Sequence, residues 1–324
     1  MATPKDSKRY ETERRIYRTL QMHYLEGMKQ SEIARVTGDS VATVSRLIKQ
    51  GHELGMVEIN IRSPFAPTLD LERELMAAAG LDEVLVVPAV SDNEAIVLQS
   101  VGEAAANLLM SRIGNGATIC ITGGKGVTAT VEGMAGGHDF DVEVVPTTGL
   151  VQGKHYTDVN HVASEMARKL GGRAYQIHAP MFADTAQQRD VLLEMRSVRD
   201  VFDRARRASV AVVGIGSIES DQSSYFDLHP DGIADRDRIL EMGAKAELIA
   251  HLLDGDGALC DYSMNAHLVA LRPDELHDIP CTIGVASGAA KVEPIRSVLR
   301  GGHLRALVTD ERTARAVLDL LRSC

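Results

Sequence analysis

Two short glycine-rich segments of the sequence each carry a lysine and have the composition of an anion site. The first, Gly123-Gly124-Lys125-Gly126-Val127-Thr128, follows an apolar run and opens a helical pattern. The second, Ser287-Gly288-Ala289-Ala290-Lys291, occupies the same position after a later apolar run. Closely spaced glycines let backbone N–H groups approach an anion, and a helix N-terminus and a lysine add positive charge. Either segment alone would also fit a plain strand-to-helix turn.

Further polar residues follow other apolar runs, at Thr147-Thr148-Gly149, Gly214-Ile215-Gly216-Ser217 and Asp254-Gly255-Asp256-Gly257. Lysines for a phosphate and a carboxylate for hydroxyl groups together suit a phosphorylated sugar or polyol. The last segment also fits a simple turn, and it is too short for a calcium loop. We expect the effector contacts to be Gly124, Lys125, Gly126, Val127, Thr128, Thr147, Thr148, Gly149, Gly216, Asp254, Gly288 and Lys291.

The elements that would position these residues alternate along the chain. Apolar, strand-like runs occupy residues 83–90, 117–122, 142–148, 174–179, 209–215, 268–271, 281–286 and 305–309, and helical patterns occupy residues 69–79, 93–113, 157–170 and 185–208. This alternation predicts an α/β fold, a doubly wound parallel sheet covered by helices on both faces. Such sheets bind ligands outside the carboxyl ends of their strands, where the glycine-rich segments fall.

A second functional pattern, near the N-terminus, predicts a helix-turn-helix. Ala34 is small where two helices would cross, Gly38 suits a turn that needs positive φ, and Ser40 is a good N-cap. Val44 and Leu47 then give the second helix an inner face. An ordinary packed helix pair with solvated cations is the alternative.

The outer face of the second predicted helix carries small residues and two cations, which suits entry into a DNA major groove. We expect Arg46 to read a base and Lys49 to contact a phosphate. Asp39 stands where many such motifs have an apolar residue, so we expect a looser or differently anchored turn. The expected DNA contacts are Gln30, Ser40, Val41, Ala42, Thr43, Ser45, Arg46 and Lys49.

The flanks of this motif complete a predicted winged domain. A helix over residues 8–26 would cover its core with Ile16, Leu20, Tyr24 and Leu25, and alternation at residues 57–62 predicts a wing strand. Pro64 and Pro67 then interrupt both helix and strand patterns. We therefore expect a DNA-binding domain at residues 1–63 and an effector and oligomerisation domain at residues 64–324.

Composition is consistent with two domains of different charge. Residues 1–62 hold 11 Lys and Arg against 8 Asp and Glu, a net charge of +3, and the remaining 24 against 37 give −13. The positive part is where DNA would bind. The four cysteines show no metal-type spacing, the N-terminus is polar, and no apolar run approaches membrane-spanning length, so we expect a cytoplasmic protein with buried thiols and no membrane contact.

The sequence resembles the SorC-type sugar-responsive transcriptional regulators from about Tyr24 to the C-terminal helix. The resemblance is carried by QSEIARVTGDSVATVSRLI at 30–48, VVPTTG at 144–149, VVGIGS at 212–217, IGVASGAAK at 283–291 and LRGGHLRALVTDERTA at 299–314. It implies a winged helix-turn-helix, an effector domain similar to ribose-phosphate isomerases and glucosamine-phosphate deaminases, and assembly into dimers or tetramers. It also implies that Lys291 binds the effector phosphate and that Asp254 contacts sugar hydroxyls. Lys125 departs from the family pattern, where many members have an aromatic residue, and so does Pro294.

The sequence therefore indicates a regulator that binds an inverted repeat in double-stranded operator DNA under the control of a phosphorylated sugar or polyol. We expect no metal, no cofactor and no catalytic residue. The alternative is a sugar-phosphate isomerase or deaminase, because Asp254, Asp256, His155, His161 and His178 could serve as acids or bases. A DNA-binding protein whose second domain only oligomerises is a third possibility.

Overall fold

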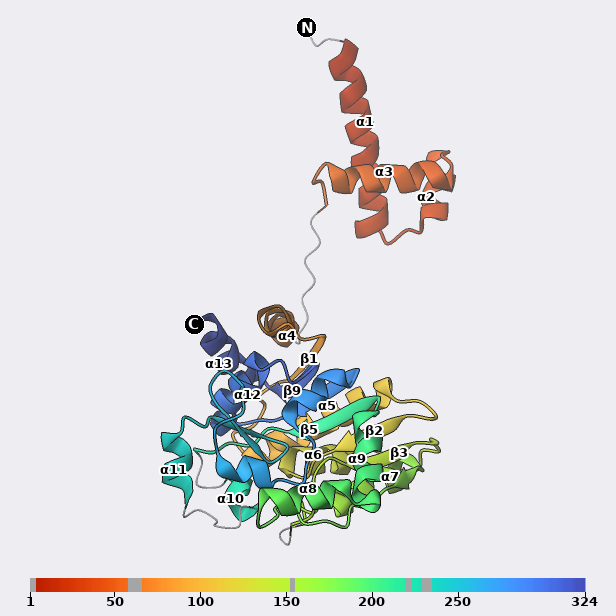
Figure 1. Ribbon diagram of the computed structural model, residues 1–324. Helices are drawn as coiled ribbons and strands as arrows, with labels where there is room; N and C mark the ends of the chain where they lie inside the picture. The colour runs from red at the N-terminus through yellow and green to blue at the C-terminus, as the bar shows by residue number, and fades with distance from the viewer. Residues whose placement is uncertain (1–3, 58–65, 152–154, 220–222, 229–234, 324) are drawn as a thin grey trace. The chain divides into compact units, whose positions relative to one another are not determined.

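The structure is a computed structural model that describes residues 4–57, 66–151, 155–219, 223–228 and 235–323. The chain forms two compact units, Met1–Pro64 and Phe65–Cys324 (Figure 1). Within the described residues no helix has both the length and the apolar character needed to cross a bilayer.

The first unit is a small helical bundle. It contains α1 (Pro4–Leu20), a π-helical turn (Gln21–Leu25), α2 (Gln30–Thr37) and α3 (Val41–Glu53). Ile16 and Leu20 are buried in its core, as expected, but Tyr24 and Leu25 are exposed. The π-helical turn explains this difference, because its wider winding changes which side chains face inward and buries Met22 instead.

The connection between α2 and α3 is a three-residue turn. Gly38 adopts the left-handed conformation with φ of 76°, and the Ser40 hydroxyl caps α3 by accepting a hydrogen bond from the Thr43 N–H at 3.1 Å. The Asp39 carboxylate accepts a hydrogen bond from the Arg15 guanidinium of α1 at 2.7 Å. The turn is therefore anchored by an ion pair instead of an apolar side chain. The wing strand expected at residues 57–62 lies outside the described residues except for Val57.

The second unit is built on a parallel sheet of seven strands. Their spatial order is β1 (Glu83–Val87), β9 (Ala306–Asp310), β8 (Cys281–Val285), β5 (Val210–Gly214), β2 (Thr118–Ile121), β3 (Glu143–Pro146) and β4 (Arg173–Ala174). The helices are α4 (Ala66–Ala79), α5 (Glu94–Arg112), α6 (Lys125–Gly133), α7 (Val159–Leu170), α8 (Ala186–Glu194), α9 (Arg196–Arg206), α10 (Ser224–Leu228), α11 (Arg236–Glu241), α12 (Val292–Arg300) and α13 (Glu311–Arg322). A separate antiparallel hairpin, β6 (Ala246–Leu248) and β7 (His251–Leu253), follows α11.

The strand order has a reversal at its centre. From β2 the chain moves outward through β3 to β4, then returns to β5 on the other side of β2 and continues to β8 and β9. Side chains of the central strands, such as Ile119, Ile121 and Val212, are fully buried, as expected for a sheet with both faces covered. A reversal of this kind leaves a crevice at the carboxyl ends of the two strands that flank it.

Three predicted elements are wrong in extent or type. Residues 268–271 form no ladder strand, because Leu268 and Ala270 make only isolated bridges to Phe182 and Thr148. The expected helix at 185–208 breaks at Met195, whose ψ of 127° is extended, so it forms α8 and α9. The expected strand at 174–179 is reduced to the two residues of β4.

The pairing of α5 with α6 depends on glycines that allow close backbone approach. A Cβ on Gly102 of α5 would lie 2.4 Å from the Ala129 carbonyl group of α6, and one on Gly133 of α6 would lie 2.8 Å from the Glu103 nitrogen. The two helices therefore contact each other through backbone, and no side chain fits at either crossing point.

Gly102→Ala is expected to destabilise the second unit by about 1 to 3 kcal/mol, because the added methyl group overpacks a backbone contact that cannot recede. Gly114→Ala is the matched control, since its Cβ would meet nothing within 4 Å. The control is expected to stay within about 1 kcal/mol of the wild type or gain stability. Urea denaturation curves compare them, and equal stability of the two variants would contradict the packing argument.

Candidate effector site

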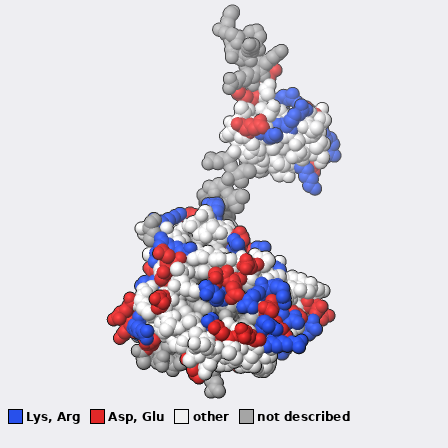
Figure 2. Space-filling view, viewed as in Figure 1, with Lys and Arg blue, Asp and Glu red and all other residues white. Residues whose placement is uncertain are grey.

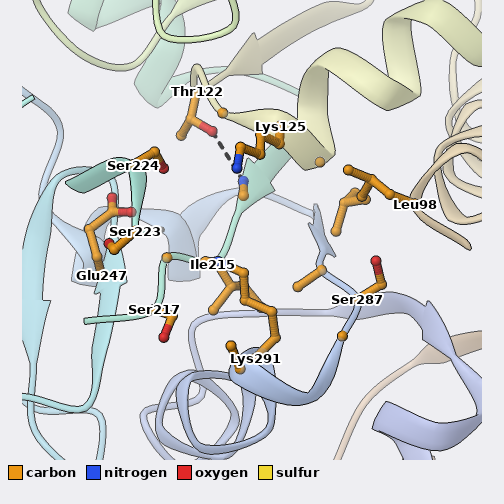
Figure 3. A pocket seen from close by; sticks show the side chains of 18 of the residues that line it. Leu98, Thr122, Lys125, Ile215, Ser217, Ser223, Ser224, Glu247, Ser287 and Lys291 are labelled. Atoms are coloured by element: carbon orange, nitrogen blue, oxygen red, sulfur yellow. Dashed lines mark hydrogen bonds between the residues drawn. The ribbon is translucent and has the colours of Figure 1, made fainter. Parts of the chain in front are cut away.

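A cavity of about 430 Å³ lies at the carboxyl ends of the neighbouring strands β2, β5 and β8 (Figure 3). The hydroxyl of Thr122, just after β2, accepts a hydrogen bond from the Gly214 N–H at the end of β5 at 3.1 Å, which joins the two strands where the sheet reverses. Polar side chains in the lining come from several elements. They are Glu94, Thr122, Lys125, Ser217, Ser223, Ser224, Glu247, Ser287 and Lys291.

Two glycine-rich helix starts face this cavity and share one backbone conformation. Gly124 has φ of 120° and ψ of 156°, and Gly288 has φ of 101° and ψ of 156°, a region that side chains rarely allow. Gly126 is required for another reason, because its Cβ would lie 2.6 Å from the Val285 carbonyl oxygen. The first N–H groups of α6 have no acceptor within their own helix, so an anion in the cavity would supply one.

Lys291 is the more buried of the two cavity lysines. Its ammonium donates a hydrogen bond to the Ile215 carbonyl oxygen at 2.7 Å. The pKa of Lys291 is lowered to about 8, mainly by burial; Glu247 partly opposes this effect, and the nearby Lys125 adds to it. A lysine held in this way gains from an anionic ligand, which would restore a favourable environment for its charged form.

Glu247, which the sequence analysis did not identify, lies across the cavity from the glycine loops (Figure 3). Its backbone exchanges hydrogen bonds with Gly216, and a Cβ at Gly216 would lie 2.1 Å from the Glu247 carboxylate. The carboxylate accepts the Ala250 N–H at 2.6 Å, and burial raises the pKa of Glu247. Glu247 lies on β6, just before a hairpin turn with positive φ at both Ile249 and Ala250. Turns of this kind usually have Asn and Gly at these positions, so the sequence contains no signal for this turn.

The structure brings about half of the expected effector residues to this cavity. Gly124, Lys125, Gly126, Gly216, Gly288 and Lys291 line it. Val127 is instead buried in the core, the Thr147 hydroxyl donates to the Ile121 carbonyl oxygen, and Gly149 packs against Pro180. Thr148 is also buried, and Thr128 lines a neighbouring groove.

Asp254 does not line the cavity, so the structure contradicts its expected contact with sugar hydroxyls. Its carboxylate accepts the N–H groups of Asp256 at 2.9 Å and Ala258 at 3.0 Å and thereby caps its own turn. Its carbonyl oxygen accepts the Ser297 hydroxyl, and Asp256 pairs with Arg300 of α12. The turn interpretation of the segment is the correct one, and Glu247 is the buried carboxylate of the cavity.

Comparisons with known proteins identify the family. Residues 63–319 match a family described as "Putative sugar-binding domain". The chain is 30% identical over 299 residues to the erythritol catabolism regulatory protein EryD of Brucella abortus (strain 2308), covering 92% of this chain and 94% of that protein. It belongs to the SorC-type family of sugar-binding transcriptional regulators.

Other SorC-type relatives agree. The transcriptional regulator LsrR of Escherichia coli O139:H28 (strain E24377A / ETEC) is 30% identical over 309 residues, with coverage of 94% of this chain and 95% of that protein. The full-length sorbitol operon regulator SorC from Klebsiella pneumoniae has a similar structure, with a TM-score of 0.73, 26% identity and coverage of 94% of this chain and 98% of that one. The resemblance inferred from sequence is thus confirmed over nearly the whole chain.

The first unit of this SorC-type chain carries the expected recognition residues on α3 and its cap, except for Gln30, which begins α2. Ser40, Val41, Ala42, Ser45, Arg46 and Lys49 are exposed on α3 or its cap, and Gln30 and Thr43 are half-buried. The opposite face of α3 buries Val44, Leu47, Ile48 and Gly51. Figure 2 shows both basic and acidic side chains on the visible face of each unit.

Burial of Lys291 predicts a pH dependence of stability in the absence of ligand. Because its folded pKa of about 8 lies below the ordinary value of 10.5, the folded protein binds fewer protons between these values. The free energy of unfolding should therefore rise with pH across this window, by up to about 3 kcal/mol. Lys291→Met has no ammonium to titrate, so its free energy of unfolding lacks this pH dependence. Measured by urea denaturation from about pH 7.5 to 10.5, the stability of the wild type should therefore rise relative to that of the variant as the pH increases. A constant difference would contradict the burial of a charged Lys291.

Proposed function

We propose that this chain is a DNA-binding transcriptional regulator whose operator affinity is controlled by a phosphorylated sugar or polyol bound in the cavity at β2, β5 and β8. The observation that carries the proposal is the convergence of two glycine helix starts and two lysines on one cavity. Its serine and threonine hydroxyls and its two carboxylates suit the hydroxyl groups of a sugar.

The phosphate of the effector would lie between Lys125 and Lys291. Both lysines line the cavity, and Lys125 begins α6, whose first N–H groups have no acceptor within their own helix. A neutral polyol would leave the two ammonium groups opposed only by Glu94 and Glu247. A phosphate ester compensates their charge and leaves the carboxylates for hydroxyl groups, which favours the phosphorylated form.

The first unit would read operator DNA with α3 in the major groove, since the small residues at its start let the helix approach base edges. One such helix contacts too little DNA for regulatory specificity. We therefore propose a homo-oligomer, a dimer or tetramer, that binds an inverted repeat with two α3 helices. The name of the SorC structure and those of the two relatives all describe regulators, in agreement with this assignment.

The acids and bases that the isomerase or deaminase alternative took from the sequence lie outside the cavity. Asp254 and Asp256 bind within their own turn or to Arg300, and the three histidines are not among the residues that line the cavity. The names of the relatives favour the regulator over the enzyme.

Arg46→Ala is expected to weaken binding to the specific inverted repeat by about 1 to 3 kcal/mol and to relax base preference at one position in each half-site, because it removes a bidentate base contact. Lys49→Ala should weaken specific and random DNA alike and reduce the salt dependence, because it removes a phosphate contact. Fluorescence anisotropy with the specific and the random duplex separates the two effects. The same titration should give a complex of at least two chains per inverted repeat. An equal loss on both duplexes for Arg46→Ala would contradict base reading.

Lys291→Ala is expected to abolish or greatly weaken the effector response and to leave effector-free DNA binding unchanged. A charge-assisted hydrogen bond contributes about 1.5 to 3 kcal/mol, so the effector concentration needed should rise about ten- to a hundredfold. The assay is effector titration of a preformed operator complex. Lys125→Ala should weaken the effector response less than Lys291→Ala does, since Lys125 is exposed and interacts with the Tyr156 ring at 5.7 Å. A normal response by Lys291→Ala together with a lost response by Lys125→Ala would move the main phosphate contact to the earlier loop.

A further inference from the structure

A second cavity of about 380 Å³ adjoins the effector cavity and extends between α5 and α6. We call it the α5–α6 groove. Ala95, Leu98 and Lys125 line both cavities, so the two spaces meet at these residues. The other residues of the groove are Gln99, Glu103, Thr128, Ala129, Glu132, Gly133, His155 and Tyr156.

Helical spacing explains why the groove has polar walls. Gln99 and Glu103 lie one turn apart on α5, and Lys125, Thr128 and Glu132 follow one another at intervals of three and four residues on α6. On each helix, one face thus lines the cavity at its N-terminal end and the groove farther along. The backbone contact at Gly102 and Gly133 fixes the two helices, so the walls of the groove are rigid.

The third side of the groove is formed by His155 and Tyr156, next to the glycine loop. Tyr156 is held there because its carbonyl oxygen accepts the Gly124 N–H at 2.6 Å. Gly123 allows this arrangement, since its Cβ would lie 2.9 Å from the Thr157 carbonyl oxygen. The Lys125 ammonium lies 5.7 Å from the centre of the Tyr156 ring, at the boundary between cavity and groove. One lysine therefore faces both spaces.

The chemistry of the groove differs from that of the cavity. Its lining includes one lysine, the shared Lys125, against the carboxylates of Glu103 and Glu132. Gln99 donates to Glu103 at 3.1 Å, so this carboxylate is oriented along the α5 wall. The Thr128 hydroxyl oxygen is buried and has no hydrogen-bond partner in the described part of the chain. These groups would bind hydroxyls or an amine and would repel a second phosphate.

We propose that the α5–α6 groove binds the unphosphorylated end of the effector, which is therefore an elongated phosphate monoester whose far end carries hydroxyl or amino groups. The phosphate lies in the cavity between Lys125 and Lys291, and the chain passes Lys125 and Leu98 into the groove. There Thr128 gains the hydrogen-bond partner it lacks, and Glu103 accepts from the ligand. This inference rests on the proposed function of the cavity and specifies the class of ligand.

The test uses the full-length chain, with inorganic phosphate, glucose 6-phosphate, glucosamine 6-phosphate, trehalose 6-phosphate and fructose 1,6-bisphosphate as probes. Calorimetry identifies the organic phosphate that binds most tightly and is then repeated on Thr128→Val and Glu103→Gln. Each variant should weaken that ester about three- to tenfold, as for the loss of one hydrogen bond, and leave inorganic phosphate unchanged. Lys291→Met should weaken both ligands.

Matched controls separate binding from structure. Thr309→Val removes another buried hydroxyl without a partner in the described residues, and Thr309 lines neither cavity. Both valine variants should unfold without ligand at or above the wild-type temperature, because each removes an unsatisfied buried polar atom. Only Thr128→Val should affect the ester. Glu194→Gln, at an exposed position on α8, controls for the loss of a charge.

The outcomes distinguish the groove from the cavity. If Thr128→Val and Glu103→Gln bind the tightest ester as the wild type does while Lys291→Met does not, the groove assignment is wrong and the effector cavity stands. The same conclusion follows if the bisphosphate is the tightest probe, because the groove would then accept a second phosphate. If no probe binds the wild-type chain, both the groove and the phosphorylated effector are rejected.

Discussion

The close approach of backbone at the reversal between β2 and β5 is the constraint on which the second unit depends. The start of α6 can lie against the end of β8 only because Gly126 has no side chain to meet the Val285 carbonyl oxygen. Gly216 likewise makes room for Glu247. These contacts bring two helix N-termini and two lysines to one space, so the same glycines that allow the packing create the site.

The electrostatics of the cavity favour a ligand that carries both an anionic group and hydroxyl groups. Burial disfavours the charged form of both groups, so it lowers the pKa of Lys291 and raises the pKa of Glu247. An anion beside the lysines would reduce the desolvation penalty of the Lys291 ammonium, and hydroxyl groups beside Glu247 would reduce that of its carboxylate. A ligand shifts an equilibrium only by its different affinity for two states. A buried, incompletely compensated charge is a physical source of such a difference, since its environment changes greatly when the anion binds.

The sequence predicted the parts of the protein that depend on local patterns. Apolar runs marked the central strands, Gly38 and Ser40 marked the turn before α3, and glycine–lysine segments marked both helix starts at the cavity. Each of these depends on a residue type that its own backbone conformation or burial requires. The sequence also indicated the family, through motifs spread over both units.

The errors arose from two turns whose local geometry the residue types do not reveal, and from one case of tertiary packing. Asp254 has the composition of a sugar ligand, but its carboxylate is used by the N–H groups of its own turn. Glu247 gave no signal because the turn after it has Ile249 and Ala250 in left-handed conformations that neither residue favours. The contribution of Ser223 and Ser224 depends on where α10 packs, which no local pattern records.

Hydrogen exchange of the full-length chain tests the central claim most directly, since it reports the ligand-binding segments without any substitution. With and without a saturating phosphate ester, mass spectrometry of peptic peptides follows the backbone amides of residues 123–128 and 288–291. The account predicts slower exchange in both segments at once, because one phosphate bound between Lys125 and Lys291 would restrict the opening of both loops. Binding of the ester with protection in neither segment, or protection around Asp254 alone, would contradict it.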